Sequence, residues 1–144
     1  MGSVVVGVDG SEASTAALEY AVEEAARRGA TLRVVSAWEL PAISAPPGAV
    51  IPQMMDGYPD QAEAVVAEAV KRARELRPDV TSEGVVVQGY AGDVLVNEGK
   101  DAVLLVLGRR GLGGLAGLLL GSISRYVADR APCPLTIVPP PAKS

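Results

Sequence analysis

The sequence predicts an α/β fold in which an open, doubly wound parallel sheet of five strands carries helices on both faces. Two observations support this class. Short β-branched apolar runs alternate with segments of helical periodicity, as in parallel strands joined by crossover helices. The chain has 144 residues, of which 49% are apolar, and this is enough for the core of one compact domain over residues 1–144.

The first strand is predicted at residues 4–8, a valine-rich run of the kind that is buried on both faces of a sheet. Ser11 is suited to cap the helix that follows, because a serine side chain can accept a hydrogen bond from the first helical turn. Apolar residues then recur at helical spacing until Gly29, which is expected to end the helix. A second strand at residues 32–38 completes a right-handed strand, helix, strand unit.

Residues 39–59 are rich in proline and glycine, so we expect an irregular connection there. Connections of this length are more often functional or disordered than purely structural, and the sequence leaves both of these alternatives open. A helix follows from Asp60, with Glu63 in the position of a capping box, and its apolar face runs up to Pro78.

The second half of the chain predicts three more strands and two shorter helices. The strands are expected at residues 83–88, 102–107 and 135–138. The first helix runs through residues 92–97 and is weakened by Gly99, because glycine costs a helix about 1 kcal/mol relative to alanine. The second helix spans residues 122–130 and is broken by Pro132.

A glycine pattern of the form GxxG, nine residues, GS comes directly after the strand predicted at residues 102–107. Its members are Gly108, Gly111, Gly121 and Ser122. Backbone N–H groups of such a turn can converge on phosphate oxygens without obstruction by side chains, and the N-terminus of the next helix favours negative charge. The pattern therefore predicts an anion site, with Ser122 as a phosphate donor or a helix cap.

The strand order decides what this glycine loop faces. In the order 3-2-1-4-5 the first and fourth strands lie side by side, so Asp9 at the end of the first would face the Gly108 loop at the end of the fourth. Ligands of open α/β sheets bind outside the carboxyl ends of the strands, at the point where the strand order reverses. We therefore expect one site built from both segments.

Charge and composition limit the classes of ligand that the chain is expected to bind. The net charge of -4 argues against nucleic acid or an anionic membrane as the main partner. Residues 108–130 nevertheless hold Arg109, Arg110, Arg125 and Arg130 against Asp129 alone, a local charge of +3 that suits a small anion. The chain has no histidine, the commonest general base, so Cys133 is expected to be a small buried side chain and not a nucleophile. The first residues show no secretory signal, and we expect a cytoplasmic protein.

Two standard nucleotide motifs do not fit the loop. A Walker loop ends in GK[ST], whereas the pattern here ends in GS without a lysine. Gly111, Gly113 and Ala116 match the GxGxxA of a dinucleotide fold, but the strand after them ends in valine and prolines where an acid would bind the ribose. These differences exclude a Walker site and argue against NAD.

The segments at residues 4–11, 108–122 and 131–134 together resemble the universal stress protein family. The resemblance spans essentially the whole chain. It implies the strand order 3-2-1-4-5, ATP binding in the cleft between the first and fourth strands, and dimerisation through the last strand at residues 135–138. It also implies that ATP acts as a regulatory ligand, with little or no hydrolysis.

The resemblance further implies a role for each site residue. Asp9 would serve the ribose and a Mg²⁺ ion that accompanies the nucleotide, and Val8 and Ala37 would line the adenine pocket. The phosphates and the ribose would be bound by Gly108, Gly111, Gly121, Ser122, Ile123 and Ser124. Arg109 and Arg110 are candidates for charge-assisted phosphate contacts, although Arg109 replaces the small polar residue that usually follows the first glycine in the family.

The sequence thus predicts an ATP-binding stress or signalling module, cytoplasmic and dimeric, whose nucleotide occupancy changes its shape or its contact with an unidentified protein partner. Residues 39–59 are the expected mobile element. One alternative is a slow ATPase or phosphoryl-transfer enzyme on the same fold, for which Asp9, Arg109 and Arg110 are the candidate groups. Another alternative is an interaction protein whose glycine loop no longer binds a ligand.

Overall fold

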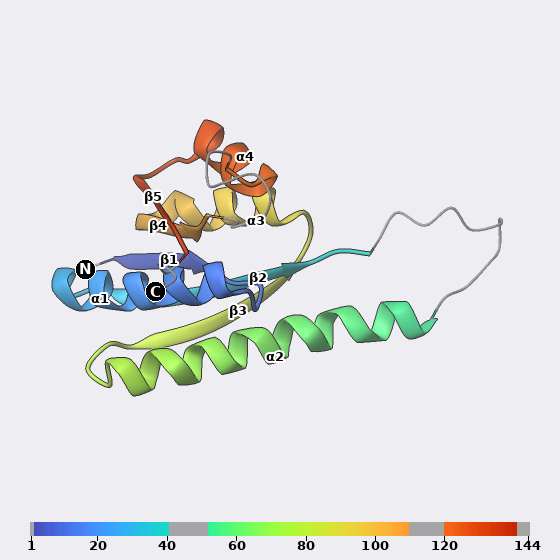
Figure 1. Ribbon diagram of the computed structural model, residues 1–144, viewed down its shortest axis with the longest axis horizontal. Coiled ribbons are helices and arrows are strands. Elements are labelled where there is room, and N and C mark those ends of the chain that lie inside the picture. The colour runs from blue at the N-terminus through green and yellow to red at the C-terminus, as the bar shows by residue number, and fades with distance from the viewer. Residues whose placement is uncertain (1, 41–51, 110–119, 141–144) are drawn as a thin grey trace.

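The computed structural model describes residues 2–40, 52–109 and 120–140, and Figure 1 shows their arrangement. The strands form one parallel sheet in the order β3-β2-β1-β4-β5. Their bounds are Ser3–Gly7 for β1, Thr31–Trp38 for β2, Ser82–Gln88 for β3, Ala102–Gly108 for β4 and Leu135–Val138 for β5. The predicted fold class and strand order are confirmed.

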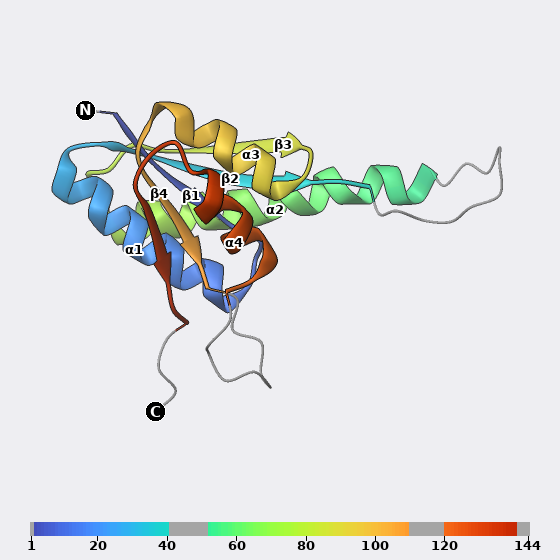
Figure 2. The same cartoon turned by 90° about the horizontal axis from the view of Figure 1, so that it is seen from above.

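The helices divide between the two faces of this sheet, as Figures 1 and 2 show. They are α1 (Glu12–Arg28), α2 (Pro52–Leu76), α3 (Ala91–Glu98) and α4 (Ser122–Arg130), with a 3-10 turn η1 (Gly99–Asp101) before β4. α1 and α2 cover one face, whereas α3 and α4 lie together on the other. Parallel strands need crossover connections, and these place helices on both faces.

Alternating residues of the central strand build two separate cores. Val4 and Val6 pack with the apolar residues of α1 and α2, whereas Val5 between them packs with those of α3 and α4. All three valines are completely buried. Successive side chains of a strand point to opposite faces, so a strand that is covered on both sides needs an apolar residue at every position. This explains the valine run from which the first strand was predicted.

The caps of α1 match the expectation. The backbone N–H of Ser14 donates to Ser11 Oγ at 3.2 Å, and Gly29 ends the helix in a left-handed conformation with a φ of 63°. Apart from the start of α2, the elements begin and end within one residue of the predicted bounds. Within the described residues, no helix combines the length and the apolar character needed to cross a membrane.

The start of α2 corrects the expectation of an irregular connection over residues 39–59. The helix already begins at Pro52 and contains Pro59 in its interior, so the predicted start at Asp60 is wrong. Proline is favoured at the first helical position. An interior proline removes one backbone hydrogen bond, which a helix of this length tolerates because its later turns are packed on the sheet. Residues 41–51 lie outside the described part of the chain.

Candidate functional site

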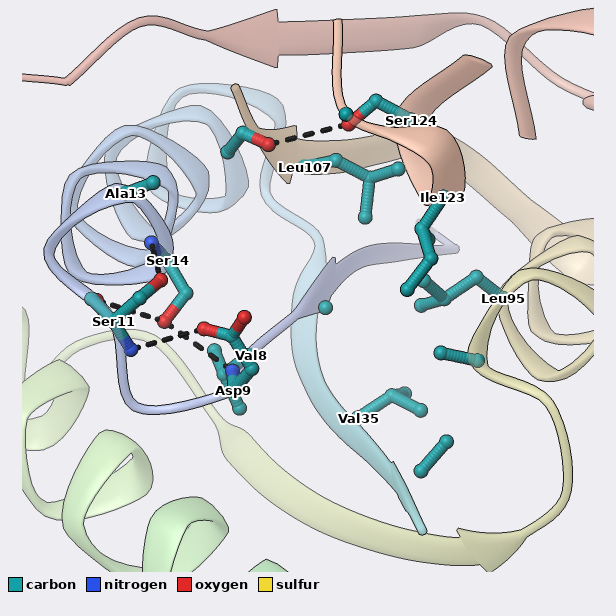
Figure 3. A pocket seen from close by; sticks show the side chains of 15 residues that line it. Val8, Asp9, Ser11, Ala13, Ser14, Val35, Leu95, Leu107, Ile123 and Ser124 are labelled. Atoms are coloured by element: carbon teal, nitrogen blue, oxygen red, sulfur yellow. Dashed lines mark hydrogen bonds between the residues drawn. The ribbon is translucent and has the colours of Figure 1, made fainter. Parts of the chain in front are cut away.

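The turn between β1 and α1 holds Asp9 in a frame of hydrogen bonds (Figure 3). The backbone N–H of Ser11 donates to Asp9 Oδ1 at 2.9 Å, and the backbone N–H of Asp9 donates to Ser14 Oγ at 3.3 Å. The buried Ser14 hydroxyl in turn donates to the Ser11 carbonyl oxygen at 3.0 Å. Gly10 permits this turn, because its φ of 85° is a conformation that side chains disfavour. The Asp9 carboxylate is therefore oriented at the carboxyl end of β1.

The end of β4 approaches the first turn of α1 too closely for a side chain. A Cβ atom on Gly108 would collide with the carbonyl group of Ala13. Gly108 is thus required by packing, which is a different reason from the phosphate contact expected for it. On the side of α4, the buried Ser124 hydroxyl donates to the Gly108 carbonyl oxygen at 3.3 Å. This bond ties the first turn of α4 to the end of β4.

These segments surround a pocket with a cavity volume of about 130 Å³ at the carboxyl ends of β1 and β4 (Figure 3). The lining residues are Gly7, Val8, Asp9, Ser11, Ala13, Ser14, Val35, Ala37, Ala91, Leu95, Leu107, Gly108, Gly121, Ile123 and Ser124. The β1–α1 turn supplies polar groups, whereas β2, α3 and Ile123 supply an apolar surface. The pocket therefore joins an apolar slot to a carboxylate and to the N-terminal end of a helix.

The pocket contains many of the residues that the sequence singled out. Those in its lining are Val8, Asp9, Ala37, Gly108, Gly121, Ile123 and Ser124. Ser122 is exposed at the start of α4 and is not in the lining, and neither is Arg109. The backbone N–H of Arg109 donates to the Val138 carbonyl oxygen at 2.7 Å, and its buried Nε has no hydrogen-bond partner among the described residues. Arg110 and Gly111 lie outside the described residues.

Other lining residues were not predicted as part of the site. Ser14 was not singled out, although it stands three residues after the cap Ser11 and therefore on the same side of the helix. Ala91 and Leu95 are spaced by four residues on α3, so both can face the same neighbour. Helical spacing indicates that such residues share one face of their helix, but it does not indicate which other element packs against that face.

Sequence comparison covers nearly the whole chain. The model of the universal stress protein family matches residues 1–139. The chain belongs to the universal stress protein family. It is 39% identical over 134 residues to universal stress protein Rv2623 of Mycobacterium tuberculosis, a match that covers 93% of this chain and 44% of that protein. The chain thus spans less than half the length of this relative.

Solved structures of other universal stress proteins share the fold. One in complex with cAMP has a TM-score of 0.70 and 32% sequence identity, and the match covers 97% of this chain and 98% of that chain. A family member from Arabidopsis thaliana with AMP bound has a TM-score of 0.68 and covers 99% of this chain and 94% of that chain. At 21% identity, the Arabidopsis structure shows the common fold alone.

Proposed function

We propose that this universal stress protein binds an adenine nucleotide, ATP with Mg²⁺, in the pocket between β1 and β4, and that nucleotide occupancy regulates it. The proposal rests on one observation, which is that an apolar slot, the Asp9 carboxylate and the start of α4 meet in one pocket. A base, a ribose and a phosphate chain require these three kinds of surface. The cAMP held by the relative with 32% identity supports adenine nucleotides as the ligand class.

The apolar slot is suited to the adenine ring. Val8 and Ala37 line it together with Val35 and Leu95. Val35 is 1% exposed and Leu95 is 5% exposed, because both also belong to the core between the sheet and α3. A base that enters the slot therefore meets aliphatic side chains that are already held in place, which lowers the entropic cost of binding.

Asp9 is suited to the ribose and to the metal. Among the described residues that line the pocket, it alone carries a carboxylate. Carboxylate oxygens accept hydrogen bonds from ribose hydroxyls, and they bind Mg²⁺. Because Mg²⁺ keeps several waters and is usually held by one or two carboxylates together with phosphates, a single carboxylate fits a metal that arrives with the nucleotide.

The phosphates are placed at the start of α4 in this proposal. Gly121, Ile123 and Ser124 line the pocket there, and the cap position is a glycine, which has no side chain to pair with the N–H groups of the first turn. Such N–H groups and the helix dipole favour an anion. The other proposed phosphate contacts are Gly108, Arg109, Arg110, Gly111 and Ser122.

Calorimetric titration with ATP, ADP, AMP and cAMP, each with and without Mg²⁺, tests the proposal. We expect binding of ATP, tightened by Mg²⁺, and loss of this Mg²⁺ effect in Asp9→Asn. Asp60→Asn is the matched control, because Asp60 is an exposed carboxylate on α2 away from the pocket. Absence of binding at millimolar ATP would overturn the proposal. An equal affinity for ATP in Gly111→Val and in the wild type would show that the glycine loop does not contribute to nucleotide binding.

The same samples distinguish regulation from catalysis. A regulatory ligand should be released as intact ATP after incubation. Turnover that falls in Asp9→Asn but not in Asp60→Asn would instead support the alternative of a slow ATPase or phosphoryl-transfer enzyme. In the regulatory case, nucleotide binding acts by favouring one of two conformations. The protein partner in the cytoplasm would bind one of these conformations more tightly than the other.

A homodimer through β5 is also proposed. β5 stands at the edge of the sheet and pairs with β4 on one side (Figure 2). All of its residues are partly exposed, and an open edge strand of this kind invites pairing with another chain. Light scattering at micromolar protein should give the mass of a dimer. Ile137→Pro should lower this mass, because Pro134 and Val138 direct their backbone carbonyl groups at β4 and the backbone groups of Ile137 therefore face the open edge. A monomeric wild type at that concentration would contradict this interface.

A further inference from the structure

A cluster of aromatic and charged side chains joins α3 to α4. We call Tyr90, Asp93, Tyr126 and Arg130 the tyrosine cluster. The Tyr126 hydroxyl donates to Asp93 Oδ1. The rings of Tyr90 and Tyr126 meet edge to face with centroids 5.0 Å apart, and Arg130 Cζ lies 3.7 Å from the centroid of Tyr126. Tyr126 therefore contacts each of the other three residues, Asp93 through its hydroxyl and Tyr90 and Arg130 through its ring.

Gly92 lets the rings rest directly on the first turn of α3. A Cβ atom at this position would lie 2.5 Å from Tyr126 Cδ1 and 2.7 Å from Tyr90 Cε2. Real Cβ atoms do not come so close to ring carbons, so this packing requires glycine. Figures 1 and 2 both show α3 and α4 side by side on the same face of the sheet. The tyrosine cluster is thus a closely packed contact between these helices.

Two residues of the tyrosine cluster are close in the chain to residues that line the pocket. Ala91 of the pocket lining directly follows Tyr90, and Ile123 of the lining stands three residues before Tyr126 on α4. Residues three apart share a helix face, so Tyr126 continues the face that carries Ile123. α3 helps to build the apolar slot, whereas α4 begins beside the proposed phosphate position. The tyrosine cluster hence connects the two ends of the pocket.

We propose that the Tyr126–Asp93 hydrogen bond is a positioning contact that couples the base end of the pocket on α3 to the phosphate end on α4. The inference rests on the proposed nucleotide function. A base that orders α3 also orders α4 through this bond, and phosphates that order α4 act on α3 in return, because coupling between sites is reciprocal. A nucleotide that occupies both ends then binds more tightly than the separate contributions of its base and its phosphates would give.

Hydrogen exchange with adenosine as the probe separates coupling from local binding, because adenosine carries the base and ribose without phosphate. In the wild type, adenosine should protect amides of α3 and also those of α4. In Tyr126→Phe, which keeps the ring and loses the hydroxyl, adenosine should protect α3 alone. The Kd of ATP should rise about fivefold, the lower end of typical couplings, whereas that of adenosine changes less.

Tyr20→Phe is the matched control. The Tyr20 hydroxyl donates to Glu24 Oε1 at 3.1 Å on α1, so this variant also removes one hydrogen bond between a tyrosine and a carboxylate, away from the pocket. It should leave protection and both affinities unchanged. If binding weakened only because the fold lost stability, both variants would bind more weakly, and this result would overturn the inference.

Two further outcomes are decisive. Protection of α4 by adenosine in Tyr126→Phe, equal to that in the wild type, overturns the coupling while the nucleotide site stands. Absence of adenosine and ATP binding in the wild type overturns the proposed function itself. Asp93→Ala should reproduce the effect of Tyr126→Phe, and the double variant should add little, because both changes remove the same bond.

Discussion

The backbone of Gly108 packs against the carbonyl group of Ala13 with no room for a side chain between them. This contact brings the end of β4 to the first turn of α1, and so it sets the distance between the two segments that carry the pocket. The Ser124 bond to the Gly108 carbonyl then adds α4 to the same point. One glycine therefore determines how three elements meet.

Gly108→Ala should destabilise the fold through this contact. The added methyl group meets backbone, which cannot rotate away, so we expect a loss of about 1–3 kcal/mol in the free energy of unfolding. Urea denaturation measures it. Gly29→Asn is the control, because nothing lies within 4 Å of a Cβ at Gly29 and asparagine tolerates its left-handed conformation. Equal stability of Gly108→Ala and the wild type would show that β4 can move away from α1 at little cost.

Ser14→Ala should loosen the turn that holds Asp9. The Ser14 hydroxyl is buried, accepts from the Asp9 backbone N–H and donates to the Ser11 carbonyl oxygen. Its removal leaves the Asp9 backbone N–H without this acceptor, so stability should fall by about 0.5–1.5 kcal/mol, and ATP should bind more weakly. Denaturation and calorimetry measure the two effects.

Thr15→Ala is the control for that variant. The Thr15 hydroxyl also donates to the Ser11 carbonyl oxygen, at 3.2 Å, but it is exposed and not in the pocket lining. Its removal should change stability by less than about 0.5 kcal/mol. If the two variants lost equal stability and equal ATP affinity, the buried position of Ser14 would have no special role.

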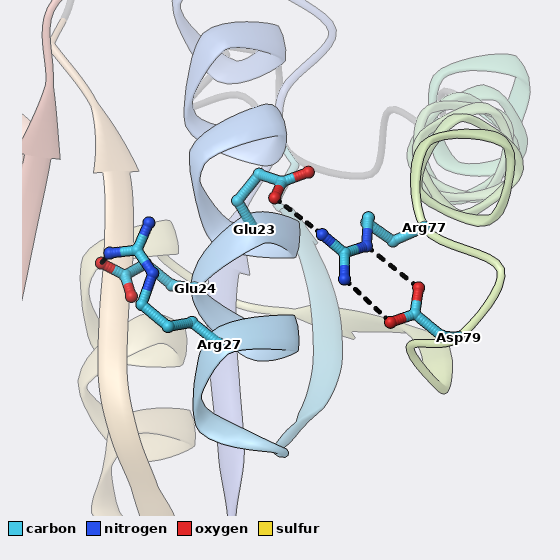
Figure 4. A network of polar contacts seen from close by, with 5 residues as sticks. All are labelled: Glu23, Glu24, Arg27, Arg77 and Asp79. Atoms are coloured by element: carbon cyan, nitrogen blue, oxygen red, sulfur yellow. Dashed lines mark hydrogen bonds and ion pairs between the residues drawn. The ribbon is translucent and has the colours of Figure 1, made fainter.

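Asp79 should make stability depend on pH at the acid end. Arg77 donates to both carboxylate oxygens of Asp79, at 3.0 and 2.9 Å, and also to Glu23 (Figure 4). The hydrogen bonds from Arg77 lower the pKa of Asp79 below its ordinary value. Because this pKa is lower in the folded protein than in the unfolded chain, the pair stabilises the fold above the ordinary value of about 3.9. The contribution is lost as pH falls through the folded pKa.

An NMR titration of the Asp79 carboxyl group checks this prediction. In Arg77→Gln, the pKa of Asp79 should return toward its ordinary value, and the acid-end loss of stability between about pH 4 and pH 2 should become shallower. The same Asp79 titration curve in wild type and variant would rule out the guanidinium as the cause of the shift.

Cys133 should react slowly with alkylating reagents. Burial raises the pKa of its thiol, and only the thiolate is a nucleophile. At pH 7.5 iodoacetamide should modify the folded protein more slowly than the urea-unfolded chain. The pH at half-maximal rate should lie above the ordinary thiol value of about 8.5 in the folded protein. Faster modification in the folded state would mean that the thiol is activated.

Local signals explain why most of the fold was predictable. The valine run of β1 and the caps Ser11 and Gly29 act within a few residues, so they can be recognised in the sequence. The start of α2 differs from the prediction, because Pro52 and Pro59 are residues of a type that usually interrupts a helix. Pro52 lies at the first helical position, where proline is favoured, and only the packing of the later turns shows that Pro59 is tolerated.

The sequence by itself determined the α/β class, the family, and the meeting of Asp9 with the Gly108 segment, because periodicity shows which residues are buried and parallel strands bring their carboxyl ends to one edge. Only the tertiary structure decided that Ala13 excludes a side chain at Gly108, and that Tyr126 contacts Asp93. Periodicity names the buried face of a helix, but the neighbour of that face depends on how whole elements pack.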